Sequence, residues 1–371
     1  QLHRRAHQLA AVLLQLAFEQ FEQGERIGRS AGEPGEHLAL AQAPHLARIA
    51  LHDGVAERDL AIAGDDHGCQ SSTLPHQSEH AFIAASIPVL NPANVQEILD
   101  YGIIGWELSR YSGCWVALKT IAENVDSSAV VDVDPLRVKI TLPTDFQLPE
   151  DGVHIRWPDP PLAQEKRLNL YKIYAARAFA RANNLNRVML DSPNPRLGII
   201  TTGKSYLDVR QALDDLGLDE ALCASVGLRV LKVGMSWPLE PVSVHEFAQG
   251  LDEILVVEEK RSIIEDQLTG QLYNWPVSKR PRVVGEFDEQ GNSLLPNLSE
   301  LTPAMIARVI AKRLAPIYTS DSIQARLAFL AAKEKALAAR SYSTVRTPHY
   351  CSGCPHNTST KVPEGSRASA G

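Results

Sequence analysis

The sequence predicts an α/β protein built on parallel sheets. Short apolar runs bounded by Gly, Pro and polar residues recur between residues 61 and 280, and segments with helical spacing of apolar residues separate them. Strands that alternate with helices form parallel sheets covered on both faces. A chain of 371 residues can hold two or three domains and bury sizeable cores.

The first sheet region is expected to begin after residue 60. Its predicted elements are a strand at 61–64, a strand at 87–90, a helix capped by Asn94 and running to Ser109, a helix at 114–125 and a strand at 130–133. The Pro- and charge-rich stretch 145–162 reads as a connector, because such composition marks domain boundaries.

The second sheet region follows a helix expected at 164–184. Its predicted elements are strands at 196–203, 228–234 and 253–259 and helices at 205–213, 245–250 and 263–272. Two polar-faced linker helices are then expected at 294–316 and 325–340.

The amino-acid composition indicates which kinds of partner and which cellular compartment to expect. The formal charge of -7 gives no electrostatic reason to expect nucleic acid or an anionic membrane as partner. No apolar run reaches the ~20 residues of a membrane span, and the N-terminus lacks the pattern of a secretory signal. Five cysteines, mostly isolated, do not suggest a disulfide scaffold, so we expect a cytoplasmic protein.

Residues 1–60 differ from the rest of the chain in amino-acid composition. They contain no Lys, Thr, Asn, Tyr, Trp, Met or Cys. One interpretation is a helical or disordered arm. The other is that the stretch is an out-of-frame translation joined to a true coding sequence.

The loop 64–79 is dense in carboxylates, imidazoles and hydroxyls and follows a predicted buried strand. Such a loop is well placed to hold a ligand at the carboxyl edge of a parallel sheet. The structural alternative is a solvated turn in which Asp65 and Ser71 cap backbone amides.

Three other features have a functional and a structural interpretation. Arg110, beside Gly113, either binds an anion or belongs to a turn between two helices. The stretch 201–205 lacks the first Gly of a phosphate loop, which favours a plain strand-to-helix turn. The charge run 258–261 is either a solvated surface or a pair of cations for a partner or a phosphate.

Cysteine spacing singles out the C-terminal segment. Cys351 and Cys354 form a Cys-x-x-Cys motif, which serves as a zinc half-site, a redox dithiol or part of an iron–sulfur site. A closed site needs about four ligands, so the chain reads as a piece of a longer protein. The other cysteines, Cys69, Cys114 and Cys223, are expected to be packing thiols.

Read together, several stretches resemble the 2-oxoacid:ferredoxin oxidoreductases, and among them the long fused indolepyruvate ferredoxin oxidoreductases. The resemblance covers nearly all of residues 60–371. It is carried by GDDHGCQSSTLPHQSE (64–79), PVLNPANVQEILDYG (88–102), SRYSGCWVALK (109–119), RLGIITTGKSYLDVRQAL (196–213), VVEEKRSIIEDQL (256–268) and YCSGCPHNTSTKVPEGSRASAG (350–371).

The resemblance implies a set of thiamine-enzyme domains. Residues 61–150 would be the C-terminal part of the thiamine pyrimidine-binding domain, and residues 165–280 a transketolase C-terminal-like domain. Residues 281–344 would be linker helices, and residues 345–371 the start of the diphosphate-binding domain.

The implied reaction is the oxidative decarboxylation of an arylpyruvate such as indolepyruvate. Coenzyme A accepts the acyl group, and ferredoxin accepts the electrons. The implied cofactors are thiamine diphosphate, Mg²⁺ and a [4Fe–4S] cluster, and the full-length protein is expected to be a homo-oligomer.

The resemblance also implies roles for individual side chains. Asp66, His76 and Glu79 would be catalytic, Cys351 and Cys354 would ligate the cluster, and the residues facing cofactor and substrate would be Asp65, Ser71, Ser72, Gln77 and Arg110. The glutamate that activates the aminopyrimidine and the Gly-Asp-Gly diphosphate motif are expected outside the matching region, so this chain alone is predicted to be inactive. The alternatives are another thiamine transferase or a non-catalytic metal-binding or interaction module.

Overall fold

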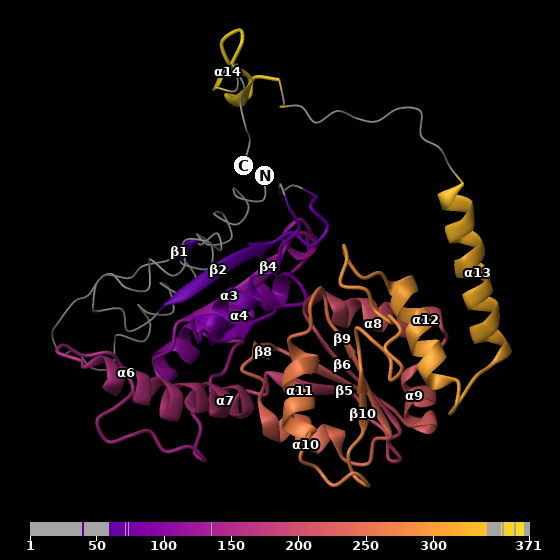
Figure 1. Ribbon diagram of the computed structural model, residues 1–371, viewed down its shortest axis with the longest axis horizontal. Coiled ribbons are helices and arrows are strands. Elements are labelled where there is room, and N and C mark those ends of the chain that lie inside the picture. The colour runs from indigo at the N-terminus through magenta and orange to yellow at the C-terminus, as the bar shows by residue number, and fades with distance from the viewer. Residues whose placement is uncertain are drawn as a thin grey trace.

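The structure is a computed structural model that describes residues 39–40, 59–70, 72, 74–134, 136–339, 350, 352–359 and 361–366. Two α/β units, each built on a five-stranded sheet, lie side by side (Figure 1). This confirms the predicted fold class of mainly parallel sheets with helices. The arm expected over residues 1–60 lies almost entirely outside the described residues.

The first sheet has the strand order β1-β2-β4-β3-β8. Its strands are β1 (Ala39–Leu40), β2 (Leu60–Asp65), β4 (Val116–Ile121), β3 (Val89–Leu90) and β8 (Met235–Trp237). All neighbours pair in parallel except β8, which runs antiparallel to β3. The carboxyl ends of β2 and β4 therefore meet at one edge, with Asp65 paired to Ile121.

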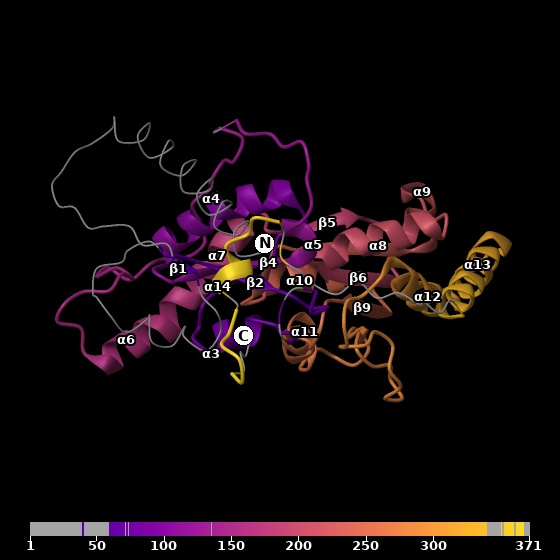
Figure 2. The same ribbon diagram turned by 90° about the horizontal axis from the view of Figure 1, so that it is seen from above.

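Helices cover both faces of this sheet (Figure 2). The short α3 (Glu79–Ala84) buries Phe82 against Ala61 and Ala63 on one face. On the other face, α4 (Val95–Ser112) and α7 (Ile173–Ala182) share a core with Leu60 and Ile62. The shorter helical elements are α5 (Ala122–Val125), α6 (Pro161–Arg167) and the π-helical turn η2 (Leu168–Lys172) that joins α6 to α7. The helix predicted at 164–184 therefore forms and packs on the first sheet.

The second sheet has the order β10-β9-β6-β7-β5. Its strands are β10 (Arg282–Val284), β9 (Glu253–Val257), β6 (Leu197–Thr202), β7 (Leu228–Val233) and β5 (Asn186–Leu190). Only β5 is antiparallel to its neighbour. Side chains alternate between two cores: Ile199 packs with α8, α9 and α12, while Ile200 packs with α10 and α11.

The helices around the second sheet include those predicted at 205–213, 245–250 and 263–272, and a further one at residues 220–226 that was not predicted. They are α8 (Gly203–Asp215), α9 (Glu220–Val226), α10 (Pro241–Ala248), α11 (Ile264–Leu272), α12 (Pro303–Leu314) and α13 (Asp321–Ala338), with α14 (His356–Ser359) near the C-terminus. The expectation of a polar-faced linker helix at 294–316 is corrected, because α12 buries Ile306, Ile310 and Leu314 in the core of this unit.

Local predictions in the first unit had mixed outcomes. The Asn94 cap is confirmed: its side-chain oxygen accepts from the Glu97 amide at 2.9 Å. The helix predicted at 114–125 is wrong, because residues 116–121 form the fully buried strand β4 and only α5 is helical. The strand predicted at 130–133 is also wrong, since this stretch is irregular and Val130 is fully exposed.

The two sheets are joined by one continuous stretch of backbone. Strand β7 of the second sheet ends at Val233, and β8 of the first sheet begins at Met235. Only Gly234 lies between them. A Cβ built on Gly234 would lie 2.5 Å from the Leu185 carbonyl oxygen and 2.6 Å from the Tyr101 hydroxyl oxygen, so glycine allows this close approach.

The carboxyl ends of the two sheets face each other. Asn91 follows β3 of the first sheet, and Gly203 follows β6 of the second. A Cβ on Gly203, whose φ is +53°, would lie 2.4 Å from the side-chain oxygen of Asn91. None of the helices in the part of the chain that the structure describes combines the length and apolarity that crossing a bilayer requires.

Candidate functional site

The loop after β2 is organised around Asp65. This carboxylate is 1 % exposed, and one oxygen accepts from the backbone amide and the hydroxyl of Ser78, at 3.0 and 3.1 Å. The other oxygen lies 3.1 Å from Nδ1 of His76, whose side chain is 45 % exposed. The loop therefore presents to solvent an imidazole that a buried carboxylate orients.

Asp66 has a different role from its neighbour. Its two carboxylate oxygens accept from the backbone amides of Gln70 and Ser72, at 2.8 and 2.9 Å. An aspartate that satisfies backbone donors in its own loop fixes the loop conformation. The structure thus gives Asp66 the capping role that the structural alternative assigned to Asp65 and Ser71.

A buried ion cluster lies behind this loop. The ammonium group of Lys119, on β4, is 2.5 Å from Glu79 and 3.5 Å from Asp65, and all three side chains are nearly inaccessible to solvent. Burial opposes the charge on Lys119, but Glu79 and Asp65 outweigh it and raise the pKa of the lysine. The cluster therefore holds a permanent cation between two carboxylates.

This cluster sets the protonation of the two loop residues. Burial opposes ionisation of Asp65, yet the hydrogen bond from His76 and the charge of Lys119 lower its pKa to about 2. The same hydrogen bond to Asp65 raises the pKa of His76. The contact with Asp65 thereby favours the protonated form of the exposed imidazole.

His67 lies between the two sheets. Its Nε2 is 3.9 Å from Asp65, and its Nδ1 is 3.9 Å from Glu259, which follows β9 in the second sheet. Burial and the nearby Lys119 lower the pKa of His67 to about 2, so its imidazole is neutral. Glu259 is in turn 3.3 Å from the ammonium of Lys204, at the start of α8.

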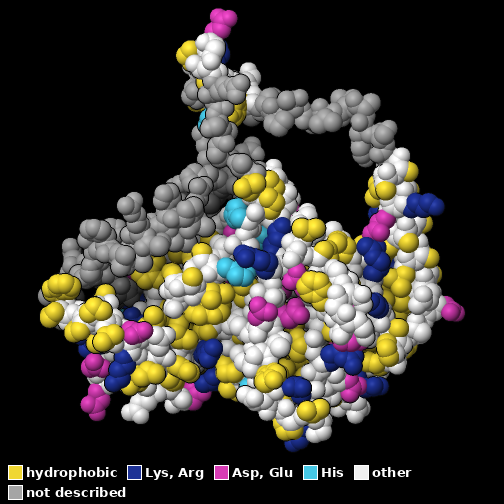
Figure 3. Space-filling model, in the orientation of Figure 1, with side chains coloured by type: hydrophobic (Ala, Val, Ile, Leu, Met, Phe, Trp, Pro, Cys, Tyr) yellow, Lys and Arg dark blue, Asp and Glu magenta, His cyan; other side chains and the backbone are white. Residues whose placement is uncertain are grey.

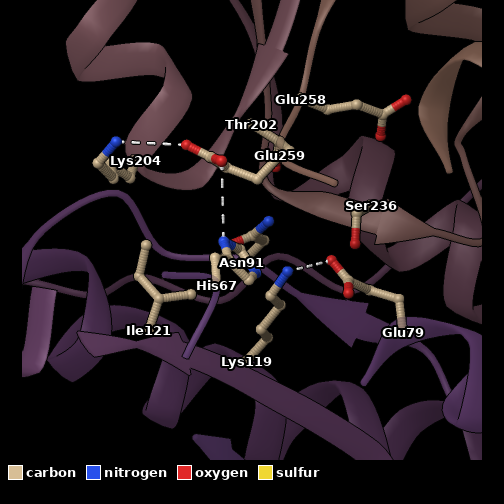
Figure 4. A pocket seen from close by; sticks show the side chains of 10 residues that line it. All are labelled: His67, Glu79, Asn91, Lys119, Ile121, Thr202, Lys204, Ser236, Glu258 and Glu259. Atoms are coloured by element: carbon tan, nitrogen blue, oxygen red, sulfur yellow. Dashed lines mark hydrogen bonds and ion pairs between the residues drawn. The ribbon is translucent and has the colours of Figure 1, made fainter. Parts of the chain in front are cut away.

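A small cavity opens among these side chains (Figure 4). The side chains of Glu79 and Lys119 point toward each other on its first-sheet side, and Glu259 lies between His67 and Lys204. The cavity is lined by His67, Glu79, Asn91, Lys119, Ile121, Thr202, Lys204, Ser236, Glu258 and Glu259. Both sheets therefore contribute side chains to one polar cavity.

Two further side-chain contacts join the two units. The side-chain amide of Gln70 donates to Glu123 at 3.3 Å and to Glu300 at 3.0 Å. Burial and a hydrogen bond with Glu300 raise the pKa of Glu123 to about 7. Because Glu300 precedes α12, this contact joins the first unit to the second.

Gln77 makes the second contact, with the backbone of Arg261. Its side chain donates to the Arg261 carbonyl at 3.0 Å and accepts from the Arg261 amide at 3.2 Å. This arrangement engages the amide of Gln77 in holding the units together. Figure 3 shows His side chains gathered beside Lys and Arg side chains on the face where the two units meet.

The remaining predicted site residues are not all brought to this place. Ser71 lies outside the described residues, and Ser72 contributes its amide to Asp66. Arg110 is at the C-terminal end of α4, near the amino ends of the strands, and pairs with Glu107 at 2.8 Å. It therefore does not face the loop, and its role in binding cofactor stays a prediction.

The cysteine motif is only half described, because Cys351 lies outside the described residues. The sulfur of Cys354 is 3.2 Å from Nδ1 of His356. Among the described residues, no group of three or more His, Cys, Asp and Glu side chains is arranged to hold a metal ion. The cluster ligands therefore stay a prediction.

The other cysteines were expected to be packing thiols. Cys114 and Cys223 are buried, and burial raises the pKa of each thiol to about 11. This confirms the expectation for these two. Cys69 is half-buried, and its thiol donates to the Ser72 carbonyl oxygen at 2.8 Å within the loop.

Sequence reasoning missed the centre of the site. Lys119 fell inside a predicted helix, although a single lysine at the end of the apolar run 116–118 is a signal for a buried, paired cation. Lys204 and Glu259 were noticed only as parts of a turn and a charge run. Their convergence depends on how the two sheets face each other, which no local pattern states.

The fold and the site define an α/β protein in which the facing carboxyl edges of two sheets enclose a cluster of titratable side chains. Residues 186–340 match the family model described as the indolepyruvate ferredoxin oxidoreductase middle domain. The chain is thus similar to the indolepyruvate ferredoxin oxidoreductases, both in this matched domain and in the relatives described next.

Curated relatives match most of the chain. The indolepyruvate oxidoreductase subunit IorA of Methanothermobacter marburgensis is 28 % identical over 86 % of this chain and 47 % of the relative. The IorA subunit of Pyrococcus abyssi is 26 % identical over 92 % of this chain and 49 % of the relative. The chain thus spans about half the length of the curated relatives it matches.

Solved structures are more distant. A 2-oxoglutarate:ferredoxin oxidoreductase from Magnetococcus marinus aligns with a TM-score of 0.48 and 16 % identity, covering 69 % of this chain and 49 % of that one. A split-gene transketolase aligns with a TM-score of 0.37 and 14 % identity, covering 70 % of this chain and 67 % of that one.

Proposed function

We propose that this chain forms one wall of the active site of a thiamine-dependent 2-oxoacid:ferredoxin oxidoreductase that acts on arylpyruvates. In the complete protein, an arylpyruvate such as indolepyruvate is decarboxylated and oxidised, coenzyme A accepts the acyl group, and ferredoxin accepts two electrons. The matched domain and the names of the relatives support this reaction.

The observation that carries the proposal is the Asp65–His76 pair. An imidazole anchored through Nδ1 to a buried carboxylate is held in one orientation, and its other nitrogen stays available at the protein surface. Such a group binds a substrate carboxylate when protonated, or exchanges a proton with a reacting atom. It stands at the carboxyl edge of a parallel sheet, where ligands of this fold class bind.

The charge balance of the site fits an anionic 2-oxoacid. Asp65 and Glu79 face the buried cation Lys119, so neither carboxylate is left unpaired to repel a substrate carboxylate. His76 is the exposed cationic group of the cluster when it is protonated. We assign His76 to proton transfer or carboxylate recognition, and Asp65, Glu79 and Lys119 to its orientation and charge.

The described residues fit only part of thiamine diphosphate. The edge around His76 offers hydrogen-bonding groups for the reactive end of the cofactor and for the substrate, whereas no described cluster suits a divalent metal at the diphosphate end. When bound, thiamine stabilises the carbanion that decarboxylation leaves behind. We place the diphosphate and its Mg²⁺ with other parts of the complete protein, and we keep Cys351 and Cys354 as proposed ligands of the iron–sulfur cluster.

The test uses the full-length subunits assembled with their cofactors. We expect indolepyruvate-dependent, coenzyme A-dependent reduction of ferredoxin, and a loss of about 100-fold in kcat/KM for His76→Asn, the range typical of a general acid–base group. His245→Asn, which changes a histidine in α10, is the matched control and should retain activity. Full activity of His76→Asn would remove the assigned role, and an inactive wild-type enzyme would remove the proposed reaction.

A further inference from the structure

The cavity between the two sheets contains more hydrogen-bonding groups than its walls satisfy. Among the described residues, both ring nitrogens of His67 are buried without a hydrogen-bond partner, and so are one oxygen of Glu79 and the hydroxyl of Ser236. All three side chains line the same cavity. Buried polar groups in proteins are nearly always hydrogen-bonded, so their clustering points to a polar molecule bound in the cavity.

His67 is the most informative of these groups. Its side chain is 1 % exposed, and its Nδ1 stands 3.9 Å from Oε2 of Glu259. That separation is too long for a direct hydrogen bond, whose length is about 2.7–3.2 Å. A separation of this size allows one small molecule, placed to the side of the line from Nδ1 to Oε2, to hydrogen-bond to both atoms.

The carboxylate on the other side is already held in place. Glu259 accepts from the backbone amide of Leu301, at 3.0 Å to Oε2, and from the ammonium of Lys204, at 3.3 Å to Oε1. These two contacts oppose a rotation of the carboxylate that would close the gap. The gap is a fixed feature of the packing between the units.

The size of the cavity limits the occupant. The space open to the centre of a water molecule is about 10 Å³, which suits about one water. A metal cation is disfavoured by the ammonium groups of Lys119 and Lys204 in the same wall. A neutral molecule that both donates and accepts matches an imidazole on one side and a carboxylate on the other.

We propose that this cavity binds one ordered water molecule that bridges Nδ1 of His67 to the carboxylate of Glu259. The water donates one hydrogen to Glu259 and forms a hydrogen bond with Nδ1 of the imidazole. His67 thereby becomes a positioning residue that links the loop of the first sheet to Glu259 and Lys204 of the second. This inference rests on the packing of the cavity and does not depend on the proposed reaction.

The first test is a high-resolution crystal structure of the chain. We expect a water peak within about 3 Å of both His67 Nδ1 and Glu259 Oε2. An empty cavity, or an imidazole in direct contact with the carboxylate, would overturn the proposal.

Two substitutions at one position separate the water site from simple packing. His67→Asn keeps a polar group where Nδ1 stood and should retain the water, whereas His67→Leu removes it and should lose the water. Retention of the same water in the leucine variant would show that His67 does not hold it.

A solution measurement on the unmodified protein guards against variants that fail to fold. Nitrogen-15 NMR of the histidine rings should show His67 as a neutral imidazole in one tautomer from pH 5 to pH 8. Protonation of His67 within that range would contradict a neutral, water-bridged ring.

Discussion

The ammonium group of Lys119 lies 2.5 Å from the carboxylate of Glu79, and both side chains are almost completely buried. Forty positions separate the two residues along the chain, and they meet because β4 lies beside the start of α3. A buried pair of this kind is costly to break, because each partner leaves the other as an unpaired charge in a poorly solvated place.

Removing one partner of this pair should destabilise the protein strongly. We expect Lys119→Met to lower the free energy of unfolding by about 3–5 kcal/mol, measured by urea denaturation. The double variant Lys119→Met/Glu79→Gln should lose less than the sum of the two single variants, because it removes the stranded charge as well. Lys139→Met, at an exposed lysine, is the control and should change stability by no more than about 0.5 kcal/mol.

The Asp65–His76 hydrogen bond predicts a shifted titration. Since Asp65 raises the pKa of His76, Asp65→Asn should lower it, as followed by NMR of the imidazole protons. A group whose pKa is raised by folding contributes stability below its unfolded value of 6.5, and this stability is lost as pH rises through the folded pKa. Glu107→Gln should leave the titration unchanged, and an unchanged titration in Asp65→Asn would refute the coupling.

The raised pKa of Glu123, at the contact between the two units, predicts that the stability of the protein depends on pH. Its pKa rises from 4.5 to about 7, so folding favours the protonated acid. Stability is therefore lost as pH rises from about 4.5 to 7, because the Glu123 carboxyl ionises at a lower pH in the unfolded chain than in the folded one. Melting temperatures at pH 5 and pH 8 should therefore differ less in Glu123→Gln than in the wild type; an equal difference would show that Glu123 does not titrate in this way.

The contact of Gln77 with Arg261 predicts a local change in hydrogen exchange. Gln77→Ala removes the acceptor of the Arg261 amide, and that amide should exchange up to about tenfold faster, as expected for one lost hydrogen bond. Gln164→Ala removes a different side-chain contact, to Asp159, and should leave the amide of Arg261 unaffected. Protection of Arg261 that survives Gln77→Ala would mean that another group shields it.

Much of the fold could be predicted from the sequence. Residues 228–234 and 253–259 combine apolar runs with flanking turns, and both form strands close to the predicted bounds. Residues 114–125 failed because a fully buried central strand has no alternation: all six residues of β4 are buried, so its pattern resembles that of a buried helix.

The candidate site was less predictable than the fold. Asp65, Asp66, His76 and Glu79 were singled out because their types and their loop are chemically informative. Asp65, His76 and Glu79 lie around one ion cluster, whereas Asp66 accepts from backbone amides of its own loop. Their partners Lys119 and Glu259 come from other strands and from the other unit, and such pairings follow from tertiary packing alone. Arg110 lies away from this cluster because it stands at the C-terminal end of α4, near the amino ends of the strands.

The passage of the backbone through Gly234 bears on how this protein can be divided. The first sheet receives its edge strand β8 from residues that directly follow β7, the third strand of the second sheet along the chain. A gene cut at residue 160 would thus deprive the N-terminal portion of both a helix that seals its core and a strand that borders its sheet. The two units are adjacent in space yet interlaced in sequence, so no single cut of the chain between residues 160 and 235 yields a first unit with all of its parts.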